Sequence, residues 1–406
     1  MLFANDLGYS SVKSTIDGQY DKFPSVIAKA SNINEYEPVQ FKNEIEEKTY
    51  MENFMNHLFV SINSPAVGLD GRYFVGNAAA NTSLPMIKFD VNDFSGKSES
   101  DLAPYLSLST IAGKAVQQFY KKNKKLPDTL SVQVEMATAL PVSEGKKKGV
   151  ANSYKDKYLS SKHIVTFNNF VDPIIVSISF KQVYVGLEGE LAQLYINNAD
   201  NGLKKQISSY LKQNYPKISD SMSIDDFLGL KDILSLDLGG GTSDSVLITD
   251  GKANANASES LKYGWGNVLQ EAVVILQDKK INFADRTALQ EYLLTTPNPI
   301  SKEKYDYVKQ IVMETAESFI DQVVAMASRS LRKAGSNVSV VYVYGGAANA
   351  LSDSTLKDKL NAKIAEFNGG FEVPIVWIDE NYAQYLNEKG LELVSDYMFK
   401  GSDSND

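Results

Sequence analysis

The sequence contains no cysteine and only two histidines, His57 and His163, among its 406 residues. Without thiols the chain forms neither disulfides nor thiolate metal sites, and this absence fits a cytoplasmic protein. With so few histidines, we expect neither a histidine-based metal centre nor Ser-His-Asp catalysis.

Long apolar runs and excess positive charge are also missing. No stretch reaches the ~18 apolar residues of a membrane helix. The start, MLFANDLG, has no basic segment and therefore does not resemble a signal peptide. The net charge of −9 argues against direct, sequence-independent nucleic-acid binding, which requires a cationic surface. We therefore expect a cytoplasmic protein with no membrane partner, and its length and 43% hydrophobic content suffice for two domains.

A glycine-rich stretch, LDLGGGTSD at Leu236–Asp244, lies between two predicted strands, Lys231–Leu238 and Ser243–Thr249. Glycines at such a tip permit positive φ and let backbone N–H groups approach a ligand. Clustered N–H groups favour phosphate, and carboxylates beside a phosphate require a cation, usually Mg²⁺. The stretch predicts a magnesium–nucleotide phosphate loop, with a plain glycine-bulge hairpin as the alternative.

The first residues repeat this pattern. Asp6-Leu7-Gly8 precedes a predicted strand that ends at an Asp17-Gly18 turn, as Asp237-Leu238-Gly239 precedes one that ends at Asp250-Gly251. The two aspartates stand 237 − 6 = 231 residues apart. Such repetition predicts two related domains. Neither copy matches the P-loop or the dinucleotide-binding pattern.

A third small-residue element, Gly345-Gly346-Ala347, follows the predicted strand Val338–Tyr344 and precedes the predicted helix Ser352–Phe367. Small residues between a strand and a helix let a flat ring or a sugar approach the backbone. An ordinary strand-to-helix turn is the alternative.

Taken in order, these elements resemble the actin superfamily of actin, Hsp70 and the sugar kinases, and most closely the plasmid-segregation actins of the ParM and Alp type. The resemblance includes two phosphate motifs, two connecting segments and an adenosine motif, namely Asp6-Leu7-Gly8, Asp237–Thr242, Ala137–Pro141, Asn381–Leu391 and Val343–Ala347. The second connecting segment departs from the family at Leu386 and Asn387, where a small residue is usual.

The resemblance implies an α/β fold of the actin/Hsp70/sugar-kinase (ribonuclease H-like) type, with two related domains around a nucleotide cleft. The alternation of predicted strands and helices agrees with α/β layers. We expect domain I at 1–185, with the C-terminal helix 379–400 packing back on it, domain II at 186–378, and a disordered tail at 401–406.

ATP (or GTP) and Mg²⁺ are the implied ligands. Asp6 and Asp237 are the expected metal-side carboxylates, acting through water. Lys13 either reaches a phosphate or makes a solvent-facing salt bridge. The expected nucleotide-binding residues are Asp6, Gly8, Tyr9, Ser10, Ser11, Lys13, Gly239, Gly240, Gly241, Thr242, Gly264, Gly266, Lys309, Gly345, Gly346 and Ala347. Trp265, between two of these glycines, is expected in the core.

The catalytic candidates are Glu188, Asp237 and Asp244. Glu188 occupies the place of the glutamate in the ParM-type P-E-S segment, although Leu187 replaces the proline. It would align the attacking water. Alternatively, Glu188 or Glu190 only favours a helix N-terminus. Asp244 either assists hydrolysis or closes its hairpin.

The resemblance implies a filament-forming actin-like ATPase, or GTPase, that segregates plasmid DNA through a small DNA-binding adaptor of the ParR type. A small-molecule kinase of the same fold is the main alternative. An Hsp70-like chaperone would need a further peptide-binding domain, and a membrane-attached actin would need an amphipathic anchor.

Several elements are predicted from periodicity and composition. Leu102–Asn123 is a helix with one apolar face, residues 31–56 form an exposed acidic loop, and a final helix runs from Glu380 to Phe399. Lys302–Ala334 is one long helix or a broken pair. Residues 31–110 match nothing closely.

Overall fold

The chain divides into two compact units in the computed structural model, which describes residues 1–30, 36–90, 93, 96–334 and 338–400. Unit 1 comprises Met1–Leu140, Glu144–Leu191 and the described residues from Asn387 on; unit 2 comprises Pro141–Ser143 and Ala192–Leu386. These boundaries lie a few residues after those predicted at 185 and 379. The predicted tail, 401–406, lies outside the described residues.

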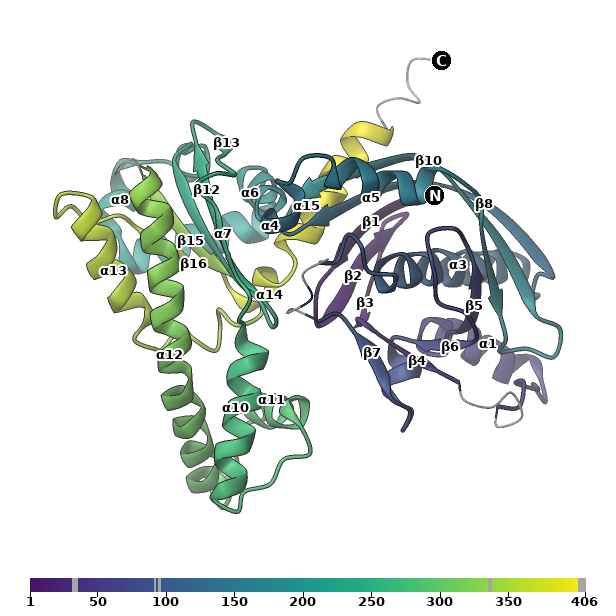
Figure 1. The fold of residues 1–406 in the computed structure, drawn as a ribbon. Coiled ribbons are helices and arrows are strands. Elements are labelled where there is room, and N and C mark those ends of the chain that lie inside the picture. Colours follow the sequence, from purple (N-terminus) through teal and green to yellow (C-terminus); the bar gives the residue numbers. More distant parts are fainter. Residues whose placement is uncertain (31–35, 91–92, 94–95, 335–337, 401–406) are drawn as a thin grey trace. The chain divides into compact units, whose positions relative to one another are not determined.

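Unit 1 is built on a curled sheet in the order β3-β2-β1-β8-β10-β9-β5-β6-β4-β7 (Figure 1). Its strands are β1 Leu2–Leu7, β2 Ser11–Ile16, β3 Gln19–Pro24, β4 Val26–Lys29, β5 Phe59–Asn63, β6 Tyr73–Val75, β7 Met86–Lys88, β8 Thr129–Leu140, β9 His163–Phe167 and β10 Ile174–Leu187. β1, β2 and β3 pair antiparallel, whereas β1, β8 and β10 pair parallel.

The helices of this part of the chain are α1 Glu44–Glu52, α2 Asn77–Ala80, α3 Leu102–Asn123, α4 Val142–Gly145, α5 Val150–Leu159 and α15 Leu386–Ser395, the last followed by a π-helical turn, Asp396–Lys400. The predicted helix at α3 is confirmed. Leu106, Ile111 and Val116 on its apolar face are fully buried in the unit 1 core.

The prediction of an exposed acidic loop at residues 31–56 is wrong over Glu44–Glu52, because these residues form helix α1. Asn43 caps this helix by accepting the N–H groups of Ile45 and Glu46, and the acidic residues lie in the first turn, where the helix dipole favours negative charge. Only Met51 of α1 is buried, so the sequence lacks the apolar stripe that reveals a helix.

Unit 2 contains a smaller sheet in the order β13-β12-β11-β15-β16, with β14 also paired to β12. Its strands are β11 Ile233–Leu238, β12 Ser243–Thr249, β13 Lys252–Ala253, β14 Glu259–Leu261, β15 Val340–Tyr344 and β16 Ile375–Trp377. Leu234, Leu236 and Val343 are fully buried in its core.

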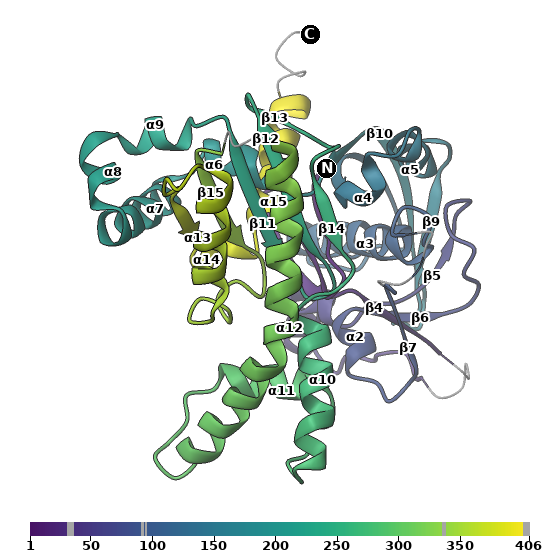
Figure 2. The same ribbon diagram turned by 60° about the vertical axis from the view of Figure 1, so that its left-hand side comes forward.

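The remaining helices are α6 Glu190–Asn197, α7 Asn201–Asn214, α8 Pro216–Ser221, α9 Ile224–Leu228, α10 Trp265–Asp278, α11 Arg286–Leu294, α12 Lys302–Ala334, α13 Leu356–Phe367 and α14 Glu380–Ala383. α12 is one continuous helix, and α10 packs against it (Figure 2). No helix in the described ranges is long and apolar enough to cross a membrane.

The final helix predicted from Glu380 to Phe399 is instead interrupted between α14 and α15. The carbonyl of Ala383, at the end of α14, accepts the N–H of Gly345. The interruption lies in the predicted second connecting segment, where the chain passes from unit 2 to unit 1.

The same five-strand order occurs in both units. β3-β2-β1-β8-β10 and β13-β12-β11-β15-β16 each contain an antiparallel three-strand meander followed by two parallel strands. The two copies of the glycine motif therefore lie at equivalent places, β1–β2 and β11–β12, in two related units.

Candidate functional site

The two glycine hairpins have the same backbone at the tip. The N–H of Gly8 donates to the Ser11 carbonyl at 3.0 Å, and the N–H of Gly239 donates to the Thr242 carbonyl at 2.9 Å. A Cβ on Gly8 would lie 2.8 Å from the Ser11 carbonyl oxygen, and a Cβ on Gly239 would lie 2.7 Å from the Thr242 carbonyl oxygen. Neither glycine has positive φ, so close backbone approach, and not a left-handed conformation, is the reason for glycine at these two positions.

The far ends of the hairpins are also alike. Asp17 and Gly18 have φ angles of 48° and 78°, and Asp250 and Gly251 have 51° and 74°. Two successive positive φ angles are typical of the tight turn that matches the twist of paired strands. The Asp-Gly pairs therefore form the turns predicted from the sequence.

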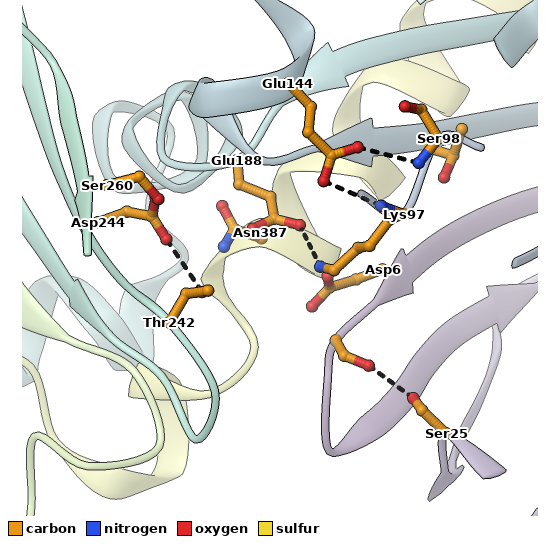
Figure 3. Close-up of polar contacts among 12 residues, drawn as sticks. Asp6, Ser25, Lys97, Ser98, Glu144, Glu188, Thr242, Asp244, Ser260 and Asn387 are labelled. Carbon is orange, nitrogen blue, oxygen red and sulfur yellow. Dashed lines mark hydrogen bonds and ion pairs between the residues drawn. The ribbon is translucent and has the colours of Figure 1, made fainter. Parts of the chain in front are cut away.

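Ser25 holds the tip of the unit 1 hairpin, Gly8–Ser11, from the side. Its hydroxyl donates to the Gly8 carbonyl at 2.6 Å (Figure 3), and its N–H donates to the Ser10 carbonyl at 3.2 Å. Ser25 is fully buried just after β3. It was not predicted, because a single serine after a strand carries no motif.

Asp6 lies at the carboxyl end of β1 and faces Lys13 across the hairpin. Their Oδ2 and Nζ atoms are 3.1 Å apart, and Asp6 is buried. Lys13 was expected either to reach a phosphate or to make a solvent-facing salt bridge. It makes a salt bridge with Asp6, but the bridge is mostly shielded from solvent, since the lysine side chain is 16% exposed.

Glu188 lies between the end of β10 and the start of α6. Its N–H donates to the Leu140 carbonyl at 2.9 Å, and Gly189 after it has a φ of 83°. The carboxylate is mostly buried and accepts from the ammonium of Lys97 at 2.9 Å. Glu190, not Glu188, is the first residue of α6. Lys97 was missed because it belongs to the stretch that matched no motif.

The second connecting segment contacts the Glu188 turn. The side-chain oxygen of Asn387 accepts the N–H of Gly189 at 2.9 Å. A Cβ on Gly390 would lie 2.0 Å from the Leu191 carbonyl oxygen. A small residue, Gly390, is therefore required in this segment, one helical turn after Leu386.

In the unit 2 hairpin, Asp237 faces Asp244 across the strands. The Asp244 carboxylate accepts from the Ser260 hydroxyl at 2.5 Å and from the Thr242 hydroxyl at 3.3 Å. These two bonds tie β12 to β14 and to the hairpin tip, so Asp244 closes the hairpin, which is one of the two roles expected for it.

Gly264 and Gly266 bring the start of α10 onto the same hairpin. The N–H groups of Trp265 and Gly266 donate to the carbonyls of Gly239 and Gly240 at 3.0 and 2.8 Å. A Cβ on Gly264 would lie 2.6 Å from the Gly239 carbonyl oxygen, which explains the glycine. The prediction that Trp265 is a core aromatic is confirmed.

The third glycine element follows β15. Gly345 has a φ of 98°, and a Cβ there would lie 2.5 Å from Oδ1 of Asp237. Gly346 is exposed and faces open space. Ala347 is buried, and its N–H donates to the Leu238 carbonyl at 2.8 Å. This amide is therefore hydrogen-bonded to the hairpin. Lys309 is an exposed residue on α12.

Each tip has backbone packed too closely for any side chain at its glycine. No cluster of three or more histidine, cysteine or acidic residues suited to a metal occurs in the part of the chain that the structure describes. A magnesium ion at Asp6 or Asp237 would therefore take its other ligands from phosphate and water, as Mg²⁺ commonly does.

Comparisons with known proteins agree with this architecture. A family model for the N-terminal domain of actin-like proteins matches residues 4–190. The crystal structure of the actin-like protein Alp7A covers 100% of this chain and 98% of its own, with 17% identity and a TM-score of 0.68. No curated protein sequence matches significantly.

Two further solved structures are similar. The ADP complex of Ta0583, an archaeal actin homologue, covers 98% of this chain and 99% of its own, with 15% identity and a TM-score of 0.60. Bacillus thuringiensis ParM with ATP covers 97% of both chains, with 16% identity and a TM-score of 0.55. Residues 4–190 thus match the N-terminal domain of actin-like proteins, and the chain as a whole has the fold of the Alp and ParM structures.

Proposed function

We propose that this protein binds ATP, or GTP, with Mg²⁺, hydrolyses it, and assembles into helical filaments that segregate plasmid DNA through a small DNA-binding adaptor of the ParR type. The observation that carries the proposal is the duplicated glycine hairpin, with one tip geometry in two related units. Solved structures of similar fold contain ADP in Ta0583 and ATP in B. thuringiensis ParM.

In this proposal the backbone at Gly8–Ser11 and Gly239–Thr242 binds the phosphates. Asp6 and Asp237 hold the waters of a magnesium ion, which would neutralise phosphate charge. Glu188 aligns the water that attacks the terminal phosphate. Gly345 and Gly346 leave room for the nucleoside.

Assembly follows from nucleotide state. Nucleotide-dependent movement of two units changes the surfaces offered to a neighbour. A head-to-tail contact that does not close into a ring propagates as a helix. Nucleotide is therefore expected to promote filament growth, and hydrolysis to favour loss of subunits.

The test is electron microscopy and pelleting of the pure protein with Mg²⁺ and, in turn, no nucleotide, the diphosphate and a non-hydrolysable triphosphate. Filaments that depend on the triphosphate support the proposal. Monomers in all three conditions at micromolar protein contradict it. A parallel assay of phosphate transfer from labelled ATP to sugars tests the small-molecule kinase.

A further inference from the structure

Lys97 is a buried lysine of unit 1 with one charged neighbour, Glu188, and one aromatic neighbour, Tyr9. Its side chain is 3% exposed, and its ammonium lies 2.9 Å from Oε1 of Glu188 and 4.5 Å from the centre of the Tyr9 ring. Tyr9 belongs to the tip of the unit 1 hairpin. A buried ammonium is costly unless it is paired, so the position of Lys97 depends on Glu188.

The backbone of Lys97 is held from the opposite side by Glu144. The N–H groups of Lys97 and Ser98 donate to the two carboxylate oxygens of Glu144 at 3.0 and 2.9 Å (Figure 3). The carbonyl of Ser98 accepts from the ammonium of Lys157 at 2.7 Å. Gly96 has a φ of 74°, and a Cβ there would lie within 2.6 Å of the Glu144 carboxylate. The lysine is therefore fixed at both its backbone and its ammonium.

The surrounding charges keep Lys97 protonated. Burial by itself would lower the pKa of Lys97, but Glu188, Tyr9 and Asp6 raise it above the usual value. A permanent cation therefore lies beside Glu188. Such a cation favours the ionised carboxylate and restricts its orientation.

We propose that Lys97 is a positioning residue for nucleotide hydrolysis: its ammonium holds the Glu188 carboxylate ionised and in one orientation, and Glu144 holds Lys97 in place through its backbone. This inference rests on the proposed hydrolysis by Glu188. A salt bridge that only stabilises unit 1 is the competing explanation, and it predicts no effect on the pH dependence of turnover.

The experiment compares Lys97→Met with Lys114→Met in single-turnover ATP hydrolysis from pH 5.5 to 9, with nucleotide affinity measured separately. Lys114 is the matched control, because it is another buried lysine of unit 1, paired with Asp21 at 2.6 Å. We expect Lys97→Met to lower turnover about 10²-fold with little loss of affinity, and to move the acid limb of the pH profile to higher pH, because Glu188 without its cation is protonated more readily. Lys114→Met should leave the profile unchanged.

Three further variants sharpen the test. Lys97→Arg keeps the charge and should recover part of the turnover and the wild-type acid limb. Glu144→Gln should change turnover in the same direction but less, by about tenfold. The double variant Lys97→Met/Glu188→Gln should be no slower than Glu188→Gln alone, because the two residues act as one unit.

The outcomes separate this inference from the proposed function. If the wild type hydrolyses ATP and Lys97→Met behaves like Lys114→Met, only the positioning role is overturned. Loss of nucleotide affinity in Lys97→Met would also overturn it, in favour of a phosphate-binding lysine. A folded wild type that binds nucleotide without hydrolysing it overturns the proposed hydrolysis, and this inference with it.

Discussion

The two glycine hairpins share a backbone but differ in the residue that faces the aspartate. Lys13 faces Asp6 in unit 1, whereas Asp244 faces Asp237 in unit 2. Both pairs lie at the same place in their hairpins. The two hairpins therefore share the shape of the tip, but the residues opposite their aspartates carry opposite charges.

This difference in charge suggests a division of labour. Unit 1 already contains a cation beside its hairpin aspartate, and its buried ion pair joins Lys97 to Glu188. In unit 2, two acidic residues face each other, which destabilises a strand pair unless other groups compensate. Hydroxyl groups compensate at Asp244. On the proposed function, we infer a division in which unit 1 supplies the residue that aligns water and unit 2 supplies the second phosphate-binding tip.

The largest expected effect is on hydrolysis, in unit 1. Glu188→Gln should lower turnover about 10²–10⁴-fold, the usual contribution of a positioned carboxylate, while nucleotide affinity holds. Asp244→Asn in unit 2 should lower it less than about tenfold, because Asp244 braces its hairpin. Single-turnover hydrolysis and equilibrium binding measure both. Equal losses in the two variants would remove the proposed division.

The shared tip should be equally sensitive in both units. Gly8→Ala and Gly239→Ala add a Cβ that meets a carbonyl oxygen at 2.8 and 2.7 Å, so each tip must open. Nucleotide affinity should fall about 10²-fold in each, as measured by titration with a fluorescent nucleotide. Gly229→Ala, whose added carbon would stay at least 3.3 Å from its neighbours, is the control. Unchanged affinity in one variant would exclude that hairpin from the site.

A buried carboxyl distinguishes the unit 1 hairpin further. Glu388 on α15 accepts from the Thr15 hydroxyl of β2, whereas the equivalent position in β12 is the apolar Val246. Burial raises the pKa of Glu388 to about 7, although the Thr15 bond works against the rise. The protonated form is therefore favoured in the folded state. The protonated Glu388 carboxyl contributes fully to the stability of the fold below the ordinary pKa of 4.5, and this contribution is lost as the pH rises through about 7.

Glu388→Gln should therefore stabilise unit 1 at pH 8, by about 2 kcal/mol, and have little effect at pH 4. Melting curves at the two pH values measure this difference. Glu392→Gln on the same helix is the control, since Glu392 is partly exposed and paired with Lys389. A Glu388→Gln protein that is no more stable than wild type at pH 8 contradicts the burial argument.

The smallest expected effect concerns the metal. Asp237→Asn should raise the Mg²⁺ concentration needed for half-maximal nucleotide binding about tenfold more than Asp6→Asn does, because Lys13 already balances Asp6. A Mg²⁺ titration at fixed nucleotide measures both variants. Equal shifts would mean that the opposing residue does not set the metal dependence.

Local patterns predicted the elements whose signals are contiguous in the sequence. α3 begins and ends where its pattern does, and both hairpins have the predicted turns. α1 was missed because its stability comes from a cap and a dipole, with little burial. The break before α15 was missed because neither Gly nor Pro marks it: Gln384 and Tyr385 separate α14 from α15.

The sequence by itself determined the repeated hairpins, the fold family and the aspartates at the strand ends, because glycine, aspartate and alternating apolar residues act over a few neighbouring positions. Only the tertiary structure decided which side chains accompany them. Lys97 reaches Glu188 across 91 residues, and Ser25 reaches Gly8 across 17. Such contacts depend on how strands and loops pack, and no short-range pattern encodes that packing.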